Sequence, residues 1–275
     1  MRQDYRDYQE QEEQAEYDAY GRRKKKRRRR YIPVTAAKMK VFGCVTMLFY
    51  SAGVAIFQNG LLHMDNYTTT ELYDLLANDA SMMTLAGWGA AFQMIGGLAV
   101  PVFTFLLVEG FRRTSSYRNY FLTLLAFAVI SEVPYDLAMS GTFWDTSSQN
   151  ALFSMVICLA MLYGLRMMGE RKGFQYRLLQ IMLIIVGVLW CELLSLAFGL
   201  CEVLLVAVYY LLYDRRGVKV LLGCAISIMY VTAPLSGYLI WGYDGQQGWH
   251  KNKYLFYLFY PVHLLILGII VYFFL

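Results

Sequence analysis

The chain has 275 residues, of which 58% are hydrophobic and only 16% are charged, and its formal net charge is +5. This composition excludes an ordinary soluble domain and predicts one membrane domain with several spans. The net charge describes the chain poorly as a whole, because eleven of the 25 Lys and Arg residues lie within the first 30 positions.

Residues 1–36 are expected to form a disordered cytoplasmic tail. Residues 1–21 are rich in Tyr, Gln, Asp and Glu and have no apolar period, so they cannot bury a core. The block RRKKKRRRR at 22–30 is typical of an anchor against the anionic inner surface of a membrane. Binding to nucleic acid is the alternative for such a block, but it fits poorly with the spans that follow. No cleavable signal peptide is recognisable, so the first span is expected to direct insertion.

Residues 37–275 are expected to be an all-α, polytopic transmembrane bundle of about eight spans, because about 20 apolar residues are needed for each crossing. The spans are placed near 40–62, 88–111, 119–140, 151–168, 177–191, 194–213, 218–242 and 254–275. The fifth and sixth are inferred to be a hairpin that turns near Glu192, because 178–213 as one helix would measure about 54 Å. The segment 82–89 is either an extra turn of the second span or a short interfacial helix.

Lys and Arg occur almost only in every second gap between the apolar runs. The gaps 63–80 and 140–150 have none, whereas 112–118 has three, 166–177 has four and 214–219 has three. Cytoplasmic loops of membrane proteins retain Lys and Arg, so this alternation predicts that both termini are cytoplasmic. We therefore expect a multi-pass protein of the cell membrane, with the bacterial plasma membrane as its location.

Ionisable residues inside the spans are candidates for function because they are costly there. Glu132 and Asp136 lie four residues apart on one helix face, with Pro134 between them, and one of them is a candidate base. The alternative is that one carboxylate pairs with an Arg or lies at headgroup level. His263 is the histidine within a span, and it is either a base or a packing residue.

Further charged residues lie at the cytoplasmic ends of the spans. Glu109 is followed by Arg112 and Arg113, with Arg118 beyond them. These arginines are either ordinary cytoplasmic charges or a phosphate site, since Arg can hold phosphate oxygens bidentately. The five cysteines have no metal-ligand spacing and are interpreted as small apolar residues, with no metal site expected.

Four segments together resemble the TraX family, in the family's order and with similar spacing. They are GLAVPVFTFLLVEGFRRT at 97–114, ISEVPYD at 130–136, NALFS at 150–154 and YPVH at 260–263. The resemblance covers the chain from about residue 37 onward. It implies an integral-membrane acyltransferase, because the family is named for a conjugation protein that acetylates pilin. It also implies acetyl-CoA as the donor and no bound cofactor.

The resemblance assigns residues to a site. The catalytic candidates are His263, Glu132 and Asp136, which are expected to share one cavity. The candidates for binding substrate or CoA are Glu109, Arg112, Arg113, Arg118, Tyr50, Ser51, Asn150 and Tyr260. Asn150 is alternatively the cap of the fourth span.

The first span departs from the family pattern. The family usually carries an Asp-His pair there, and Tyr50 and Ser51 occupy those two places. A hydroxyl is no base at neutral pH, so the proton would pass to His263 or a carboxylate, and Ser51→Ala is expected to be mild.

Three functions follow from these features. The first is transfer of an acetyl group from cytosolic acetyl-CoA to an unknown acceptor, which would be a glycan, a lipid or a protein amine. The second is a proton-coupled transporter or permease that uses Glu132 and Asp136. The third is a catalytically degenerate scaffold, which is suggested by Tyr50 and Ser51. The partners expected are the lipid bilayer and acetyl-CoA, with no nucleic acid.

Overall fold

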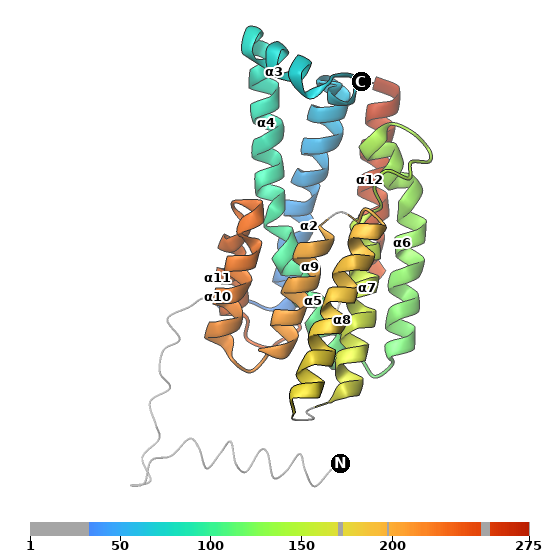
Figure 1. The fold of residues 1–275 in the computed structure, drawn as a ribbon. Helices are drawn as coiled ribbons and strands as arrows, with labels where there is room; N and C mark the ends of the chain where they lie inside the picture. The colour runs from blue at the N-terminus through green and yellow to red at the C-terminus, as the bar shows by residue number, and fades with distance from the viewer. Residues whose placement is uncertain (1–32, 170–172, 197, 249–253, 275) are drawn as a thin grey trace. The chain divides into compact units, whose positions relative to one another are not determined.

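A computed structural model describes residues 33–169, 173–196, 198–248 and 254–274, so the predictions for the tail at 1–32 lie outside the described residues. The described chain is helical, as predicted, and its only β pairing is two isolated bridges, Val34 to Tyr243 and Gln149 to Leu196 (Figure 1). The elements are α2 (Ala36–Ala52), the π-helix η1 (Gly53–Leu61), η2 (Met64–Asn66), α3 (Thr69–Asn78), α4 (Ala80–Gly97), α5 (Ala99–Arg113), α6 (Tyr117–Ser140), α7 (Ala151–Met168), α8 (Phe174–Leu193), α9 (Gly199–Leu211), α10 (Arg216–Ser227), η3 (Ile228–Tyr230), η4 (Ala233–Ser236), α11 (Gly237–Gly242) and α12 (Tyr254–Phe274).

Within the described residues, six helical stretches are long and apolar enough to cross a membrane. They are Ala36–Leu61, Ala80–Arg113, Tyr117–Ser140, Ala151–Met168, Phe174–Leu193 and Tyr254–Phe274. The fifth stretch, α8, is the least covered by protein, since only 11% of its most apolar window is buried. These stretches support the prediction of a multi-pass membrane protein.

The second stretch is one long helix with a break at Leu98. Pro101 has no backbone N–H to donate to the carbonyl four residues earlier, so the helix is interrupted just before it. The segment 82–89 belongs to this helix as its first turns, because α4 begins at Ala80. The first of the two alternatives for that segment is therefore the correct one.

Helices α8 and α9 form the predicted hairpin. The chain turns between these two helices, where Ser195 and Phe198 both have positive φ. Helix α9, however, has only 13 residues, which reach about 20 Å and fall short of the roughly 30 Å of a bilayer core. The predicted sixth span is thus a short helix inside the bundle.

The prediction of a seventh span at 218–242 is wrong. The chain breaks at Val231, whose φ is +41°, and Pro234 lies in the short helix η4 that follows. Gly237 then packs against Cys224, and Gly217 lies near Trp241, so α10 and α11 run antiparallel. This hairpin returns to the end of the bundle where it began. The hairpin could not be recognised in the sequence, because the residues at which the helix is interrupted lie within a continuous apolar run.

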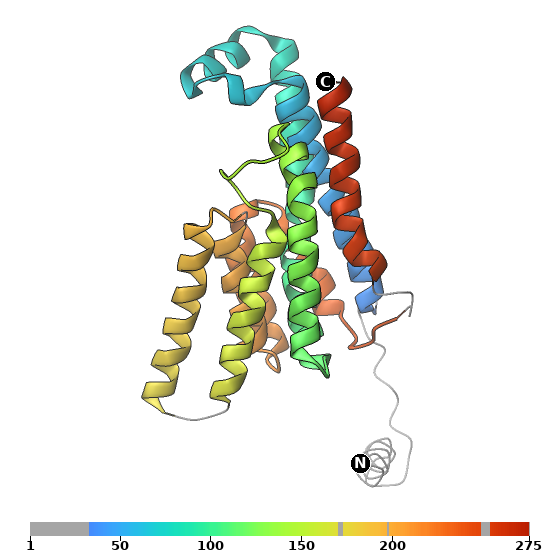
Figure 2. The same ribbon diagram turned by 90° about the vertical axis from the view of Figure 1, so that its right-hand side faces the viewer.

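Because that hairpin does not cross, α12 runs in the direction opposite to the one predicted. It is parallel to α2, since Lys40 lies over the ring of Phe256 and Ser51 contacts His263 further along both helices. It is also parallel to α6, beside which it lies along its length (Figure 2). Pro33 and the end of α12 are therefore at opposite ends of the bundle, which corrects the expectation of two cytoplasmic termini.

One end of the bundle, called the basic end below, carries every Lys and Arg of the described chain. Helices α2, α6, α8, α10 and α12 begin there, and α5, α7, α9 and α11 end there. These residues are Lys38, Lys40, Arg112, Arg113, Arg118, Arg166, Arg177, Arg215, Arg216 and Lys219. By the charge rule for membrane proteins, a basic end of this kind is the one expected to face the cytoplasm.

Candidate functional site

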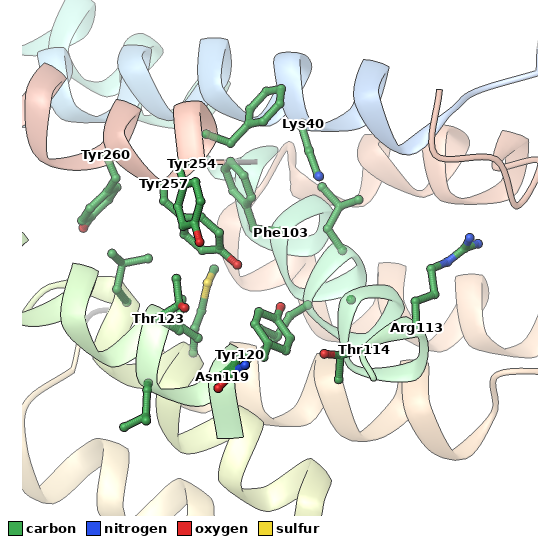
Figure 3. Close-up of a pocket in the computed structure, with 18 of the residues that line it drawn as sticks. Lys40, Phe103, Arg113, Thr114, Asn119, Tyr120, Thr123, Tyr254, Tyr257 and Tyr260 are labelled. Carbon is green, nitrogen blue, oxygen red and sulfur yellow. The ribbon is translucent and has the colours of Figure 1, made fainter. Parts of the chain in front are cut away.

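A cavity of about 680 Å³ lies between α2, α5, α6, α7 and α12 (Figure 3). Lys40 and the exposed Arg113 line it at the basic end, and Tyr260 lines it deeper in the bundle. Its volume falls in the range of small-molecule sites, which is about 300–1,000 Å³. The cavity thus has a cationic mouth and leads toward the middle of α2 and α12.

Ser51 and His263 form a buried pair just beyond the inner part of this cavity. Ser51 Oγ lies 3.1 Å from His263 Nε2, and the two residues are 3% and 5% exposed. Met47 lines the cavity one turn before Ser51, and Tyr260 lines it one turn before His263. Residues three or four apart share a helix face, so the faces that line the cavity also carry this pair.

The partner of the second ring nitrogen fixes the tautomer of His263. Nδ1 lies 2.8 Å from the carbonyl oxygen of Phe259, which can only accept, so Nδ1 carries a proton. In the neutral ring, Nε2 then accepts, and the Ser51 hydroxyl donates to it. The Phe259 ring stacks on the imidazole at 4.7 Å and holds its plane. This arrangement is that of a hydroxyl activated by an oriented base.

Glu132 is bound to Asn150 and not to His263. The Asn150 side-chain amide donates to Glu132 Oε2 and also to the carbonyl oxygen of Ala128, at 2.9 Å. The Asn150 side-chain oxygen accepts from the N–H of Leu152 at 3.0 Å, so Asn150 is the N-cap of α7 as well. Asn150 is therefore the cap of α7, whereas its role in binding substrate stays a prediction.

Asp136 is held by the loop between α6 and α7. Its Oδ2 accepts from the N–H of Asp145 at 3.1 Å, whereas its buried Oδ1 has no hydrogen-bond partner. Glu132 Oε1 is likewise buried and without a partner. The two carboxylates share a face of α6, as predicted, but each has a separate partner. Among the described residues, no hydrogen bond joins either of them to His263, so the three catalytic candidates do not form one hydrogen-bonded cluster.

A third carboxylate, Glu202 of α9, was missed by the sequence analysis. It is 1% exposed and accepts a hydrogen bond from Ser154 of α7. The available signal was an acid within the apolar run 199–211, which in a membrane protein is a candidate by default. Tyr260, which lines the cavity, lies within electrostatic range of both Glu202 and Glu132.

Tyr50 does not accompany Ser51 toward the histidine. Its ring packs edge-on against Phe198 at 5.1 Å, and its backbone lies against Gly96 of α4. Adjacent residues of a helix point about 100° apart, which accounts for the difference. Tyr50 is therefore a packing residue between α2, α4 and the turn before α9.

The acidic residue at the basic end belongs to an internal network. Glu109 accepts from Tyr213 at 2.6 Å, from Tyr243 at 3.1 Å and from Nε of Arg113 at 3.1 Å. Arg113 also donates to the carbonyl oxygen of Gly245 at 2.7 Å. Glu109 is 3% exposed, so it is a binding partner for these side chains and is not available to a ligand.

The predicted pair of arginines does not form one fork. Arg112 lies over the ring of Tyr213 at 3.7 Å, whereas Arg113 turns to Glu109 and the cavity. Arg118 is exposed in the first turn of α6. Of the three, Arg113 lines the cavity, and Lys40 joins it there as a residue that the sequence analysis did not select.

The cysteines are free, and four of the five are buried. Among the described residues, no group of three or more His, Cys, Asp and Glu side chains is placed to hold a metal ion. The site is therefore built from hydroxyl, imidazole, amide and carboxylate groups.

Apolar helices of membrane length, arranged around a polar centre, define a multi-pass membrane protein with a buried site. The family model described as TraX protein matches residues 61–271. The chain belongs to the TraX family. It is similar to a probable fimbrial assembly protein, FimC of serogroup H1, from Dichelobacter nodosus. That protein is 26% identical over 204 residues, which cover 64% of this chain and 80% of the relative. No solved structure matches the chain.

Proposed function

We propose that this protein is a membrane acyltransferase that takes an acetyl group from acetyl-CoA at its basic end. The observation that carries the proposal is the cavity, whose lining runs from Lys40 and Arg113 at the basic end to Met47 and Tyr260. Met47 and Tyr260 lie one helical turn before Ser51 and His263, which form a hydrogen-bonded pair. Phosphate groups of CoA are anionic and favour the mouth, while the long pantetheine arm fits an apolar, tyrosine-lined interior.

His263 is the base in this proposal. Its Nε2 is the accepting nitrogen, and burial keeps the imidazole away from water. A positioned base of this kind contributes roughly a hundredfold or more to transfer. Glu132 and Glu202, which both interact electrostatically with Tyr260, are proposed to support an acceptor hydroxyl or amine.

The acceptor is proposed to be a protein subunit. The similar protein from Dichelobacter nodosus is named for fimbrial assembly, and the protein subunits of a fimbria offer amines and hydroxyls. A glycan or a lipid hydroxyl is the alternative acceptor.

Binding of CoA to the purified full chain tests the proposal. We expect CoA and acetyl-CoA to raise the unfolding temperature, because a ligand that binds the folded state stabilises it. Lys40→Gln should weaken this effect. Arg177→Gln is the matched control, since Arg177 also lies at the basic end but does not line the cavity. If neither CoA nor acetyl-CoA stabilises the protein, the proposal is wrong.

A proton-coupled permease remains the second candidate. It is favoured by the buried, unpaired oxygens of Glu132 and Asp136. Proton-coupled flux in proteoliposomes that is lost in Glu132→Gln, without any binding of CoA, would establish it in place of the first.

A further inference from the structure

We infer that Ser51 is the nucleophile of this reaction and carries the acetyl group as a covalent ester between donor and acceptor. The inference rests on the proposed function and adds the path that the acyl group takes. It reverses the expectation, drawn from the sequence, that replacing Ser51 is mild.

The geometry of the pair is the first argument. Ser51 Oγ donates to His263 Nε2 over 3.1 Å, within the range expected for a nucleophile and its base. The base is oriented by a third group, the Phe259 carbonyl at 2.8 Å, which completes the usual arrangement of nucleophile, base and orienting acceptor. Nε2 is thus occupied, and an incoming acceptor would have to displace Ser51 to reach it.

Burial is the second argument. Both side chains are at most 5% exposed, so an ester on Ser51 would be kept from water until an acceptor arrives. Ser51 also lies two residues before the π-helix η1, and π-helical segments within α-helices are frequent at functional sites. A structural serine in a helix more often bonds its own backbone, as Ser131 does with the carbonyl oxygen of Phe127.

The access route is the third argument. Met47 and Tyr260 line the cavity one turn before the pair, and a turn is about 5.4 Å. A thioester that extends from the mouth along the cavity to Met47 and Tyr260 therefore comes within about one helical turn of Ser51. A covalent intermediate allows donor and acceptor to enter in sequence, so the site need not hold both at once.

The reaction balances in two steps. In the first, Ser51 Oγ bonds to the thioester carbonyl carbon while His263 Nε2 takes the hydroxyl proton. The carbon–sulfur bond then breaks, and the thiolate receives that proton and leaves as CoA thiol. In the second, the acceptor hydroxyl or amine gives its proton to Nε2 and attacks the ester. The bond to Ser51 Oγ breaks, and Oγ takes the proton back.

The test is to mix the purified full chain with radiolabelled acetyl-CoA in the absence of acceptor and to map the label by mass spectrometry. We expect a burst of CoA thiol, at most one per protein, and label on the peptide that contains Ser51. Ser51→Ala and His263→Ala should reduce the burst by about a hundredfold or more. Ser131→Ala, a buried serine with a backbone partner, is the matched control and should retain it.

Ser51→Cys provides a variant with a distinct signature. It should trap the acetyl group as a thioester that neutral hydroxylamine removes, whereas the native oxygen ester resists this treatment. The mapping on the unsubstituted protein does not depend on how well any variant folds.

Two results would overturn the inference. Transfer at the native rate in folded Ser51→Ala, or label on another residue, would remove Ser51 from the path and leave the acyltransferase function intact. If the protein neither binds CoA nor releases CoA thiol, the proposed function itself fails, and the inference fails with it.

Discussion

Asn150 is expected to stabilise the meeting point of α6 and α7 more than any exposed asparagine can. Asn150→Ala removes the N-cap of α7, which is worth about 1 kcal/mol. It also removes the donor to Glu132 and leaves that partly buried carboxylate short of a partner, at a cost of about 1–3 kcal/mol. Together these losses amount to about 3 kcal/mol.

For a domain of this size, about 3 kcal/mol corresponds to a decrease in the unfolding temperature of about 6–12 °C. The measurement is thermal unfolding of the purified protein in detergent, followed by circular dichroism. Asn119→Ala is the control, because Asn119 is exposed in the first turn of α6 and should change the free energy of unfolding by less than about 0.5 kcal/mol.

A double-mutant cycle tests the cause of the effect. Glu132→Ala should cost less in the Asn150→Ala background than alone, with a coupling energy of about 1 kcal/mol or more. Two results would contradict a contribution from the hydrogen bond between Asn150 and Glu132. The first is that the free-energy costs of the two substitutions simply add. The second is that Asn150→Ala and Asn119→Ala unfold at the same temperature.

Three further predictions concern packing, pH and direction. Gly96→Ala should destabilise the protein by about 1–3 kcal/mol, because the new Cβ would lie 2.2 Å from a side-chain atom of α2. Gly87→Ala in the same helix is the control and should be neutral or stabilising, because its Cβ would meet nothing within 4 Å. Equal unfolding temperatures of the two variants would refute this prediction. Asp145, in the α6–α7 loop, has a pKa held below its ordinary 3.8 by side-chain and backbone hydrogen bonds from neighbouring serines. Because the pKa of Asp145 is lower in the folded state, the stability that its carboxylate contributes should be present above pH 3.8 and lost as the pH falls through the lowered pKa. The difference in unfolding temperature between the native protein and Asp145→Asn should therefore persist at neutral pH and vanish in acid. A difference that does not change with pH would contradict this prediction. Single cysteines introduced at Thr70 and Phe273 should be labelled by an impermeant reagent from the same side of the membrane. A cysteine in the loop between α5 and α6 should be labelled from the opposite side. If the cysteine at Phe273 is labelled from the same side as that loop, α12 runs antiparallel to α2 and the assigned direction is wrong.

The sequence alone determined the class of fold and the end at which the charges gather. Apolar runs of about 20 residues and basic residues in alternate loops are local properties, and each can be recognised without knowing what packs against it. The pairing of Glu132 with Asp136 on one helix face was predictable for the same reason, since it depends only on a spacing of four residues. The hairpin of α8 and α9 followed from length.

Only the tertiary structure decided the course of 218–242, because a hairpin that returns and a helix that crosses can have equally apolar sequences. Val231 with positive φ and the packing of Gly237 against Cys224 are long-range outcomes, and they reverse the direction of α12. That direction in turn brings Ser51 and His263, separated by 212 positions, into contact. Glu132 likewise pairs with Asn150 and not with an arginine. A buried polar group hydrogen-bonds to the partner that the fold brings within reach, and the spacing of residues in the sequence does not determine which partner that is.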